Sequence, residues 1–115
     1  MALKHNSTLH LLGLERNYIS DKGAMFIAGA LTQNNTLEIL YLTENSVGND
    51  GAESFANALR QNSVLSTLEL GKNCISDDGV KSISNALKHN NTLKKLYLYS
   101  NYISNIGADA IVSAL

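Results

Sequence analysis

The chain has 115 residues, 44% of them hydrophobic and 17% charged, an ordinary composition for one globular domain. Its formal net charge of −1 excludes the basic surplus of nucleic-acid-binding and membrane-surface proteins, so we expect neither nucleic acid nor a membrane as a partner. The N-terminus lacks the apolar core of a signal peptide, and the single cysteine, Cys74, is typical of a reducing compartment, so we expect an intracellular, cytoplasmic protein.

One 28-residue pattern recurs four times without an insertion, and every copy opens with Ala-Leu. The copies cover residues 2–29, 30–57, 58–85 and 86–113, and residues 114–115 begin a fifth. A fixed period of this length predicts a solenoid, in which each unit buries its apolar face against its neighbours. We therefore predict a single repeat domain over residues 1–115.

The first half of each copy predicts a short strand. Leu12 and Leu14 alternate with more variable residues, as a strand with one buried face requires, and the same pair recurs in the later copies. An asparagine stands three residues after each pair, at Asn17, Asn45, Asn73 and Asn101. Because its side chain both donates and accepts, we expect it to satisfy backbone groups of successive turns.

The second half of each copy predicts a helix, since apolar residues such as Ala52, Phe55, Ala56 and Leu59 are spaced at i, i+3, i+4 and i+7. The residue before each helix suits an N-cap: Ser20, Gly48, Ser76 and Ser104. A glycine in each first turn predicts close backbone approach to a neighbour: Gly23, Gly51, Gly79 and Gly107. An asparagine beyond each helix predicts a left-handed residue there: Asn6, Asn34, Asn62 and Asn90.

The repeat resembles a known family in the run Thr36-Leu37-x-x-Leu40-x-Leu42-x-x-Asn45-x-Val47 followed by a Gly-Ala helix start. It is similar to the ribonuclease-inhibitor-type leucine-rich repeat. That resemblance implies an α/β solenoid, a right-handed horseshoe arc with a parallel β-sheet on the concave face and helices on the convex face. Relatives with this repeat include inhibitors, sensor regions of immune receptors and bacterial effectors that act inside host cells. The resemblance therefore implies a non-enzymatic protein-recognition module or scaffold with a protein partner.

In such a fold the residues that alternate with the strand leucines face the concave groove, and further variable positions follow just beyond the strand. All five tyrosines of the chain occupy these variable positions. Tyrosine provides a large contact area at a small entropy cost, while mixed charges suit a protein partner better than a phosphate backbone. Tyrosine also suits strands by propensity alone, which is the alternative explanation. The candidate partner-binding residues are Glu15, Arg16, Tyr18, Tyr41, Glu44, Glu69, Lys72, Lys95, Tyr97, Tyr99 and Tyr102.

Two other surfaces could take part in association. Met25 and Phe26 occupy outward helix positions that are polar or small in later copies. The pair could form a contact patch. Alternatively, Phe26 could pack against the open N-terminal end. At the other end the expected strand Lys95 to Tyr99 has no next repeat and no polar cap, so its leucines lack cover. The alternative prediction is a homo-oligomer formed through uncapped ends, or a segment of a longer or designed array.

No pattern of residues predicts chemistry. His5 and His10 lie in the first repeat and His89 in the fourth, none is spaced for metal binding with Cys74, and no glycine-rich phosphate loop precedes a helix. We expect Cys74 to be half-buried. The sequence therefore predicts no catalytic residue, no metal site and no cofactor.

Overall fold

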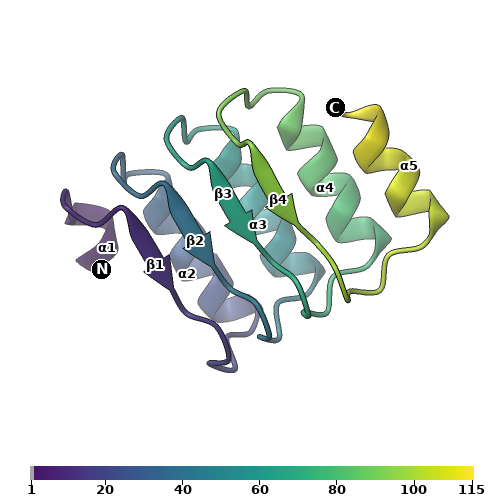
Figure 1. Cartoon of the computed structure of the whole chain (residues 1–115), viewed down its shortest axis with the longest axis horizontal. Coiled ribbons are helices and arrows are strands. Elements are labelled where there is room, and N and C mark those ends of the chain that lie inside the picture. The colour runs from purple at the N-terminus through teal and green to yellow at the C-terminus, as the bar shows by residue number, and fades with distance from the viewer. Residues whose placement is uncertain (1) are drawn as a thin grey trace.

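Each repeat folds as one strand and one helix, and the repeats stack side by side in the computed structural model, which describes residues 2–115 (Figure 1). The helices are α1 (Ala2–His5), α2 (Asp21–Leu31), α3 (Asn49–Leu59), α4 (Asp77–Leu87) and α5 (Asn105–Ser113). The strands are β1 (Leu11–Gly13), β2 (Ile39–Tyr41), β3 (Thr67–Glu69) and β4 (Lys95–Tyr97). The predicted alternation of strand and helix is confirmed.

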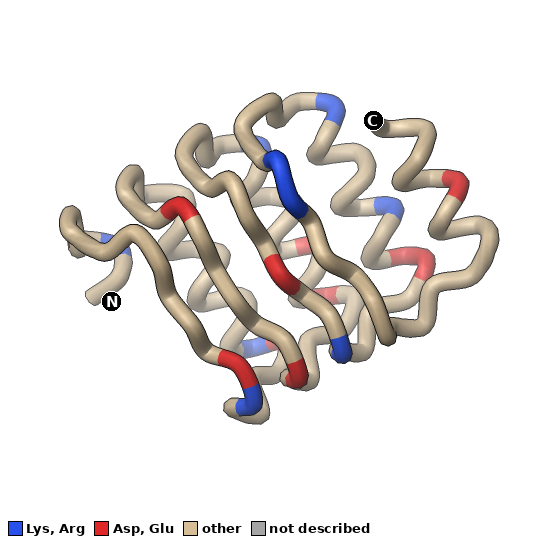
Figure 2. The backbone as a smooth tube through the Cα atoms, in the orientation of Figure 1, with Lys and Arg blue, Asp and Glu red and all other residues tan. Residues whose placement is uncertain are grey.

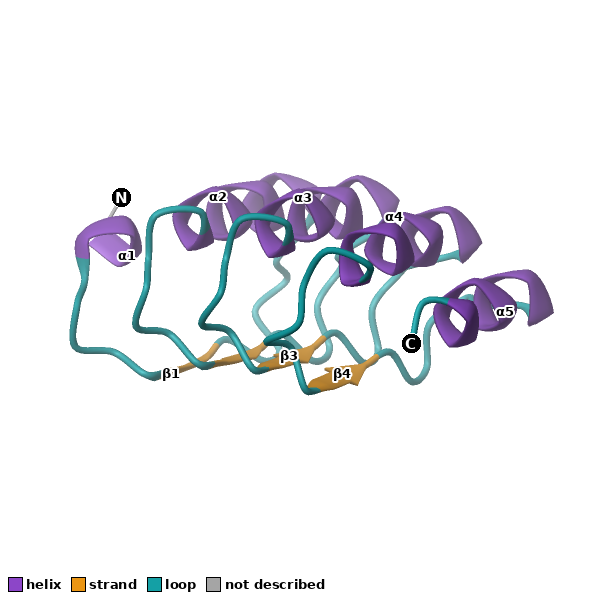
Figure 3. Ribbon diagram, turned by 90° about the horizontal axis from the view of Figure 1, so that it is seen from above, coloured by secondary structure: helices purple, strands orange, loops and turns teal. Residues whose placement is uncertain are grey.

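The four strands form one parallel sheet in the order β1-β2-β3-β4, and all helices lie on one side of it (Figure 3). Leu12 pairs with Leu40, Leu40 with Leu68, and Leu68 with Leu96, so the register is one repeat per strand. The leucine side chains point between the layers, and Leu40, Leu68 and Phe55 are fully buried there. The predicted α/β solenoid with a parallel sheet on one face and helices on the other is confirmed.

The core is best covered in the two middle repeats. Leu93, Leu96 and Leu98 of the last repeat are only partly buried, whereas their equivalents in the third repeat are fully buried. A solenoid unit is buried by its neighbours, so a repeat with a neighbour on one side buries less. The last strand also ends at Tyr97 rather than at Tyr99 as predicted, although the Tyr99 carbonyl still accepts from Lys72 N–H (2.8 Å) before the backbone turns at Ser100, where φ is 54°.

The asparagines that follow the strands satisfy backbone groups of two repeats at once, as predicted. Asn45 Nδ2 donates to the carbonyls of Leu14 and Leu42, each at 3.0 Å. Its Oδ1 accepts from the N–H groups of Asn17 and Ile19, each at 2.9 Å. Asn45, Asn73 and Asn101 therefore each join their own turn to the turn of the preceding repeat, whereas the Asn17 side chain bonds within its own turn.

The asparagines beyond the helices have a different role from the one predicted. Asn34 Oδ1 accepts from the N–H groups of Thr36 and Leu37, and its Nδ2 donates to the carbonyls of Leu3 and Asn6. Within residues 2–115, positive φ angles occur at Arg16, Tyr18, Glu44, Lys72 and Ser100 and at none of these asparagines. The prediction of a left-handed residue was wrong, because the side chain here closes a turn whose backbone stays in an ordinary conformation.

The helix N-termini are capped mainly across repeats. Ser20 and Ser76 occupy N-cap positions, but within the described chain their side chains accept no capping hydrogen bond, and Gly48 has no side chain to do so. Ser104 accepts one from Ile106 N–H. Instead Asp21 Oδ1, at the start of α2, accepts from the N–H groups of Gly48 (2.6 Å) and Gly51 (3.0 Å) in the next repeat. An acidic or amide side chain at a helix start thus caps the neighbouring helix.

Candidate functional site

The surface of the sheet that faces away from the helices, called the sheet face here, carries most of the predicted binding residues. It is made by the residues at positions 11, 13 and 15 and their equivalents in the later repeats. Over the first three repeats this face is hollowed by a pocket of about 510 Å³. The pocket is lined by Glu15, Arg16, Tyr41, Thr43, Glu44 and Glu69. Five of these six residues are candidates from the sequence, and Thr43 is not.

One carboxylate of this pocket is held by two cations. Arg16 Nε lies 3.2 Å from Glu44 Oε2, and Lys72 Nζ lies 3.3 Å from Glu44 Oε1. These three residues stand at equivalent positions with φ between 53° and 57°, so the repeated left-handed turn places their side chains in one row. The hydrogen bonds from Arg16 and then Lys72 lower the pKa of Glu44. Since all three side chains are substantially exposed, the row orders this edge more than it stabilises the fold.

Tyr99 crosses from the last repeat toward the pocket. Its ring lies over Gly71, where a Cβ atom would collide with ring carbons, and its hydroxyl donates to Glu69 Oε1 at 2.9 Å. This hydrogen bond to Glu69 raises the pKa of Tyr99, because ionising the phenol would place a second negative charge beside the carboxylate. The absence of a side chain at Gly71 is therefore what permits the contact between the third and fourth repeats.

The hydroxyl of Thr43 is a polar group that sequence reasoning missed. Thr43 is 9% exposed, and its Oγ1 is buried without a hydrogen-bond partner in the part of the chain that the structure describes. Thr43 lowers the pKa of Tyr99, whereas Glu69 raises it. The hydroxyls of Thr43 and Tyr99 nevertheless do not meet hydrogen-bond geometry. Thr43 follows Leu42 at the position equivalent to Glu15, which marks it as facing the pocket, but its burial could not be predicted from that position.

The other predicted residues lie around the pocket or apart from it. Lys95 and Tyr97 stand on β4, where Figure 2 shows a basic stretch of backbone, and acidic stretches lie in the first three repeats. Tyr18 and Tyr102 lie past the strand ends, where they are 92% and 71% exposed, whereas Tyr97 and Tyr99 are about half as exposed. The structure thus brings together the acidic candidates and spreads the tyrosines around them.

Met25 and Phe26 lie on α2, in the helical layer on the other side of the sheet. They are 53% and 58% exposed, and they border a shallow hollow that includes Lys4 and Gln33. They are not part of the sheet face. Their role in association stays a prediction.

The remaining predictions concern metal ligands and the exposure of Cys74. Among residues 2–115 no three His, Cys, Asp or Glu side chains are grouped so that they could hold a metal ion. Cys74 is exposed, so the prediction of a half-buried cysteine was wrong. It follows the buried Asn73 on the loop beyond β3, where the alternation of the strand has ended.

Comparison with known families decides the identity of the repeat. The family model described as "Leucine Rich repeat" matches four times, at residues 5–28, 33–56, 61–84 and 89–112. The chain belongs to the leucine-rich repeat family. The four matches are spaced by the 28-residue period of the sequence, so the predicted family is confirmed, while the ribonuclease-inhibitor subtype stays a prediction.

Two solved structures have a similar fold. The chain is similar to "Leiomodin-1 Actin-Binding Site 2 (ABS2)", with a TM-score of 0.89 and 21% identity over 97% of this chain and 67% of that one. It is also similar to the Caenorhabditis elegans tropomodulin C-terminal domain, with a TM-score of 0.66 and 12% identity over 98% of this chain and 86% of that one. No curated protein sequence matches the chain. At these identities the likeness shows the fold.

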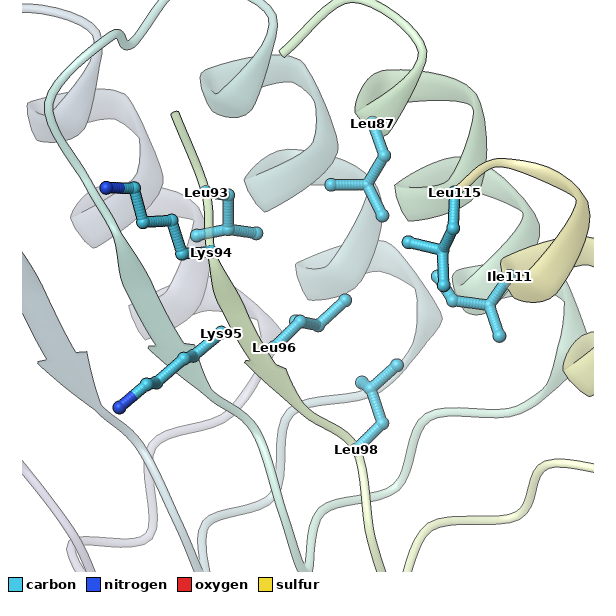
Figure 4. A pocket seen from close by; sticks show the side chains of 8 residues that line it. All are labelled: Leu87, Leu93, Lys94, Lys95, Leu96, Leu98, Ile111 and Leu115. Carbon is cyan, nitrogen blue, oxygen red and sulfur yellow. The ribbon is translucent and has the colours of Figure 1, made fainter. Parts of the chain in front are cut away.

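The last repeat carries a second hollow, which is apolar. Figure 4 shows it between β4 and α5, with a volume of about 400 Å³. Six apolar residues line it: Leu87, Leu93, Leu96, Leu98, Ile111 and Leu115. In the inner repeats the equivalent leucines are buried by the next strand, so this cleft is the open face of the leucine-rich repeat stack.

None of the helices formed by residues 2–115 is long and apolar enough to cross a membrane.

Proposed function

We propose that this leucine-rich repeat protein is a non-enzymatic recognition module that binds a protein partner through its sheet face. The observation that carries the proposal is the gathering of exposed tyrosines and charged side chains around one hollow on that face. Aromatic and charged side chains on a rigid surface are the usual hot spots of protein interfaces. The leiomodin-1 domain of the same fold is described as an actin-binding site, which supports a protein as the partner. The single cysteine supports an intracellular location.

Tyr97 and Tyr99 are the substitutions that test this function. Changing both to alanine should weaken partner binding by at least about a hundredfold, because hot-spot side chains contribute about 2 kcal/mol or more each. The measurement is capture of proteins from a cell lysate on the immobilised chain, followed by titration of a captured partner. Circular dichroism should be unchanged, since both side chains lie on the surface.

The matched control is Lys81→Ala on the exposed side of α4, which should bind like the wild type. If the double variant captures the same partners with the same affinity, the sheet face is not the binding surface. Loss of binding by the control as well would point to the helical face instead.

As a second candidate function we propose that the 115-residue chain stacks head to tail with a second copy. The apolar cleft of the last repeat supports this, because a docked strand from another copy would cover its leucines. The capping contacts between repeats indicate that a second copy could dock there. Asp77 Oδ1 accepts from the N–H groups of Ser104 (2.8 Å) and Gly107 (3.1 Å) in the next repeat. Asn105 holds the same place in α5 and is exposed, so it can receive the equivalent N–H groups, Ser20 and Gly23, of a second copy.

Stacking predicts a molar mass that depends on concentration. Light scattering over a hundredfold range of protein concentration should show a rise from one copy toward larger species. Leu96→Glu, which places a charge in the cleft, should restore a single-copy mass, whereas Val112→Glu on the exposed side of α5 should not. A constant single-copy mass of the wild type over the whole range would contradict the stacking proposal.

A further inference from the structure

The pocket on the sheet face has three carboxylates and one arginine in its lining, so it carries more negative than positive charge. The two ion pairs found among residues 2–115 both involve Glu44, so Glu15 and Glu69 face the pocket without a cationic partner. The Tyr99 hydroxyl occupies one oxygen of Glu69, and the other remains available as an acceptor. Glu15, just past β1, and Glu69, on β3, lie two strands apart with β2 between them, and both present acceptors to whatever enters the pocket.

Thr43 adds an independent indication that a donor belongs in this pocket. It stands between Glu15 and Glu69 in the repeat order, lines the pocket, and has a buried Oγ1 without a partner among the described residues. A buried hydroxyl left without a hydrogen bond is costly and uncommon in folded proteins. A ligand that donates hydrogen bonds would satisfy Thr43 and the two carboxylates together.

The ligand must carry positive charge at the end of a longer body. A bare metal ion does not fit, because no three of the His, Cys, Asp and Glu side chains within residues 2–115 are grouped closely enough to hold one. An ammonium or guanidinium group has several donors and can bridge acceptors that are further apart. The half-buried ring of Tyr41 offers an apolar and cation-binding surface for its alkyl stem.

The charges outside the pocket favour the same place for such a group. Lys94 and Lys95 on and beside β4 repel a cation from the last repeat, while the pocket carboxylates attract it to the first three. We propose that this pocket binds a lysine or arginine side chain of a protein partner, held by Glu15 and Glu69 with Thr43 as a neutral acceptor. This inference rests on the proposed function, whose partner class it names.

The test uses single-residue probes on the full chain. Nα-acetyl-lysine methylamide and its arginine analogue are titrated into ¹⁵N-labelled protein, and the amide shifts of Tyr41, Thr43 and Glu69 are followed. Both probes should shift these amides saturably. The uncharged Nα,Nε-diacetyl-lysine methylamide, the anionic acetyl-glutamate methylamide and calcium chloride at matched ionic strength should not.

Substitutions assign the acceptors. Glu15→Gln and Glu69→Gln should each weaken lysine binding by about tenfold, since a hydrogen bond to a charged group is lost in each case. Glu38→Gln, which changes an exposed carboxylate outside the pocket, should bind like the wild type. Thr43→Val should weaken binding without lowering Tm, because it removes a hydroxyl that the fold leaves unpaired.

Several results would overturn the inference: equal shifts with diacetyl-lysine, tighter binding of calcium than of lysine, or no saturable shift in the pocket. If partner capture depends on Tyr97 and Tyr99 but the lysine probe does not bind, this inference is overturned and the recognition proposal stands. Lysine binding in the pocket, together with capture that ignores those tyrosines, would contradict the recognition proposal and leave the cation site standing.

Discussion

Replacing Asn73 with alanine should lower the free energy of unfolding by about 4 kcal/mol, because it leaves several buried backbone groups without partners. Asn73 Nδ2 donates to the carbonyls of Leu42, Leu70 and Gly71 at 3.0–3.1 Å, and Oδ1 accepts from Val47 N–H at 3.0 Å. The residue is 5% exposed, so water cannot replace these bonds. Urea unfolding followed by circular dichroism measures the change.

The matched control is Asn17→Ala, the equivalent change in the first repeat. Asn17 is exposed, and its side chain donates to the carbonyl of Glu15 in its own turn (2.9 Å), so its loss should cost less than about 1 kcal/mol. Equal effects of the two substitutions would show that the contact between repeats contributes nothing beyond the local turn, which would contradict the role assigned to Asn73.

Replacing Gly51 with alanine should lower the free energy of unfolding by about 2 kcal/mol, although alanine is the better helix former. A Cβ atom there would lie 2.7 Å from Val47 Cγ1, 2.8 Å from Asp21 Oδ1 and 3.0 Å from Ala24 Cβ. Two of these atoms belong to the preceding repeat, so the substitution must push neighbouring repeats apart or break the cap from Asp21. Thermal and urea unfolding of the variant measure the loss.

Gly29→Ala in α2 separates helix propensity from packing. A Cβ atom at Gly29 would meet nothing within 4 Å, and the position is exposed. The change should therefore raise stability by about 0.5–1 kcal/mol. A stabilised Gly51→Ala variant would mean that the repeats are not held as close together as this structure has them.

The candidate site could be predicted only in part from the sequence. Position within the repeat was enough to place Glu15, Tyr41 and Glu69 on the sheet face, because a period-two strand exposes every second side chain. It could not show that Tyr99 reaches back over Gly71 to Glu69, since that contact depends on side-chain lengths in two adjacent repeats. Nor could it show that Thr43 is buried with no partner for its hydroxyl among residues 2–115.

The sequence by itself determined the repeat, the order of strand and helix, the buried leucines and the role of the asparagines after the strands. It could do so because a regular stack puts every residue against its equivalent 28 positions away, so one period describes all neighbours. Only the tertiary structure decided which backbone groups each capping side chain serves. Asp21 caps the helix of the next repeat, Ser20 caps nothing within residues 2–115, and Asn34 closes a turn. These choices depend on distances between repeats, which a pattern along one chain does not contain.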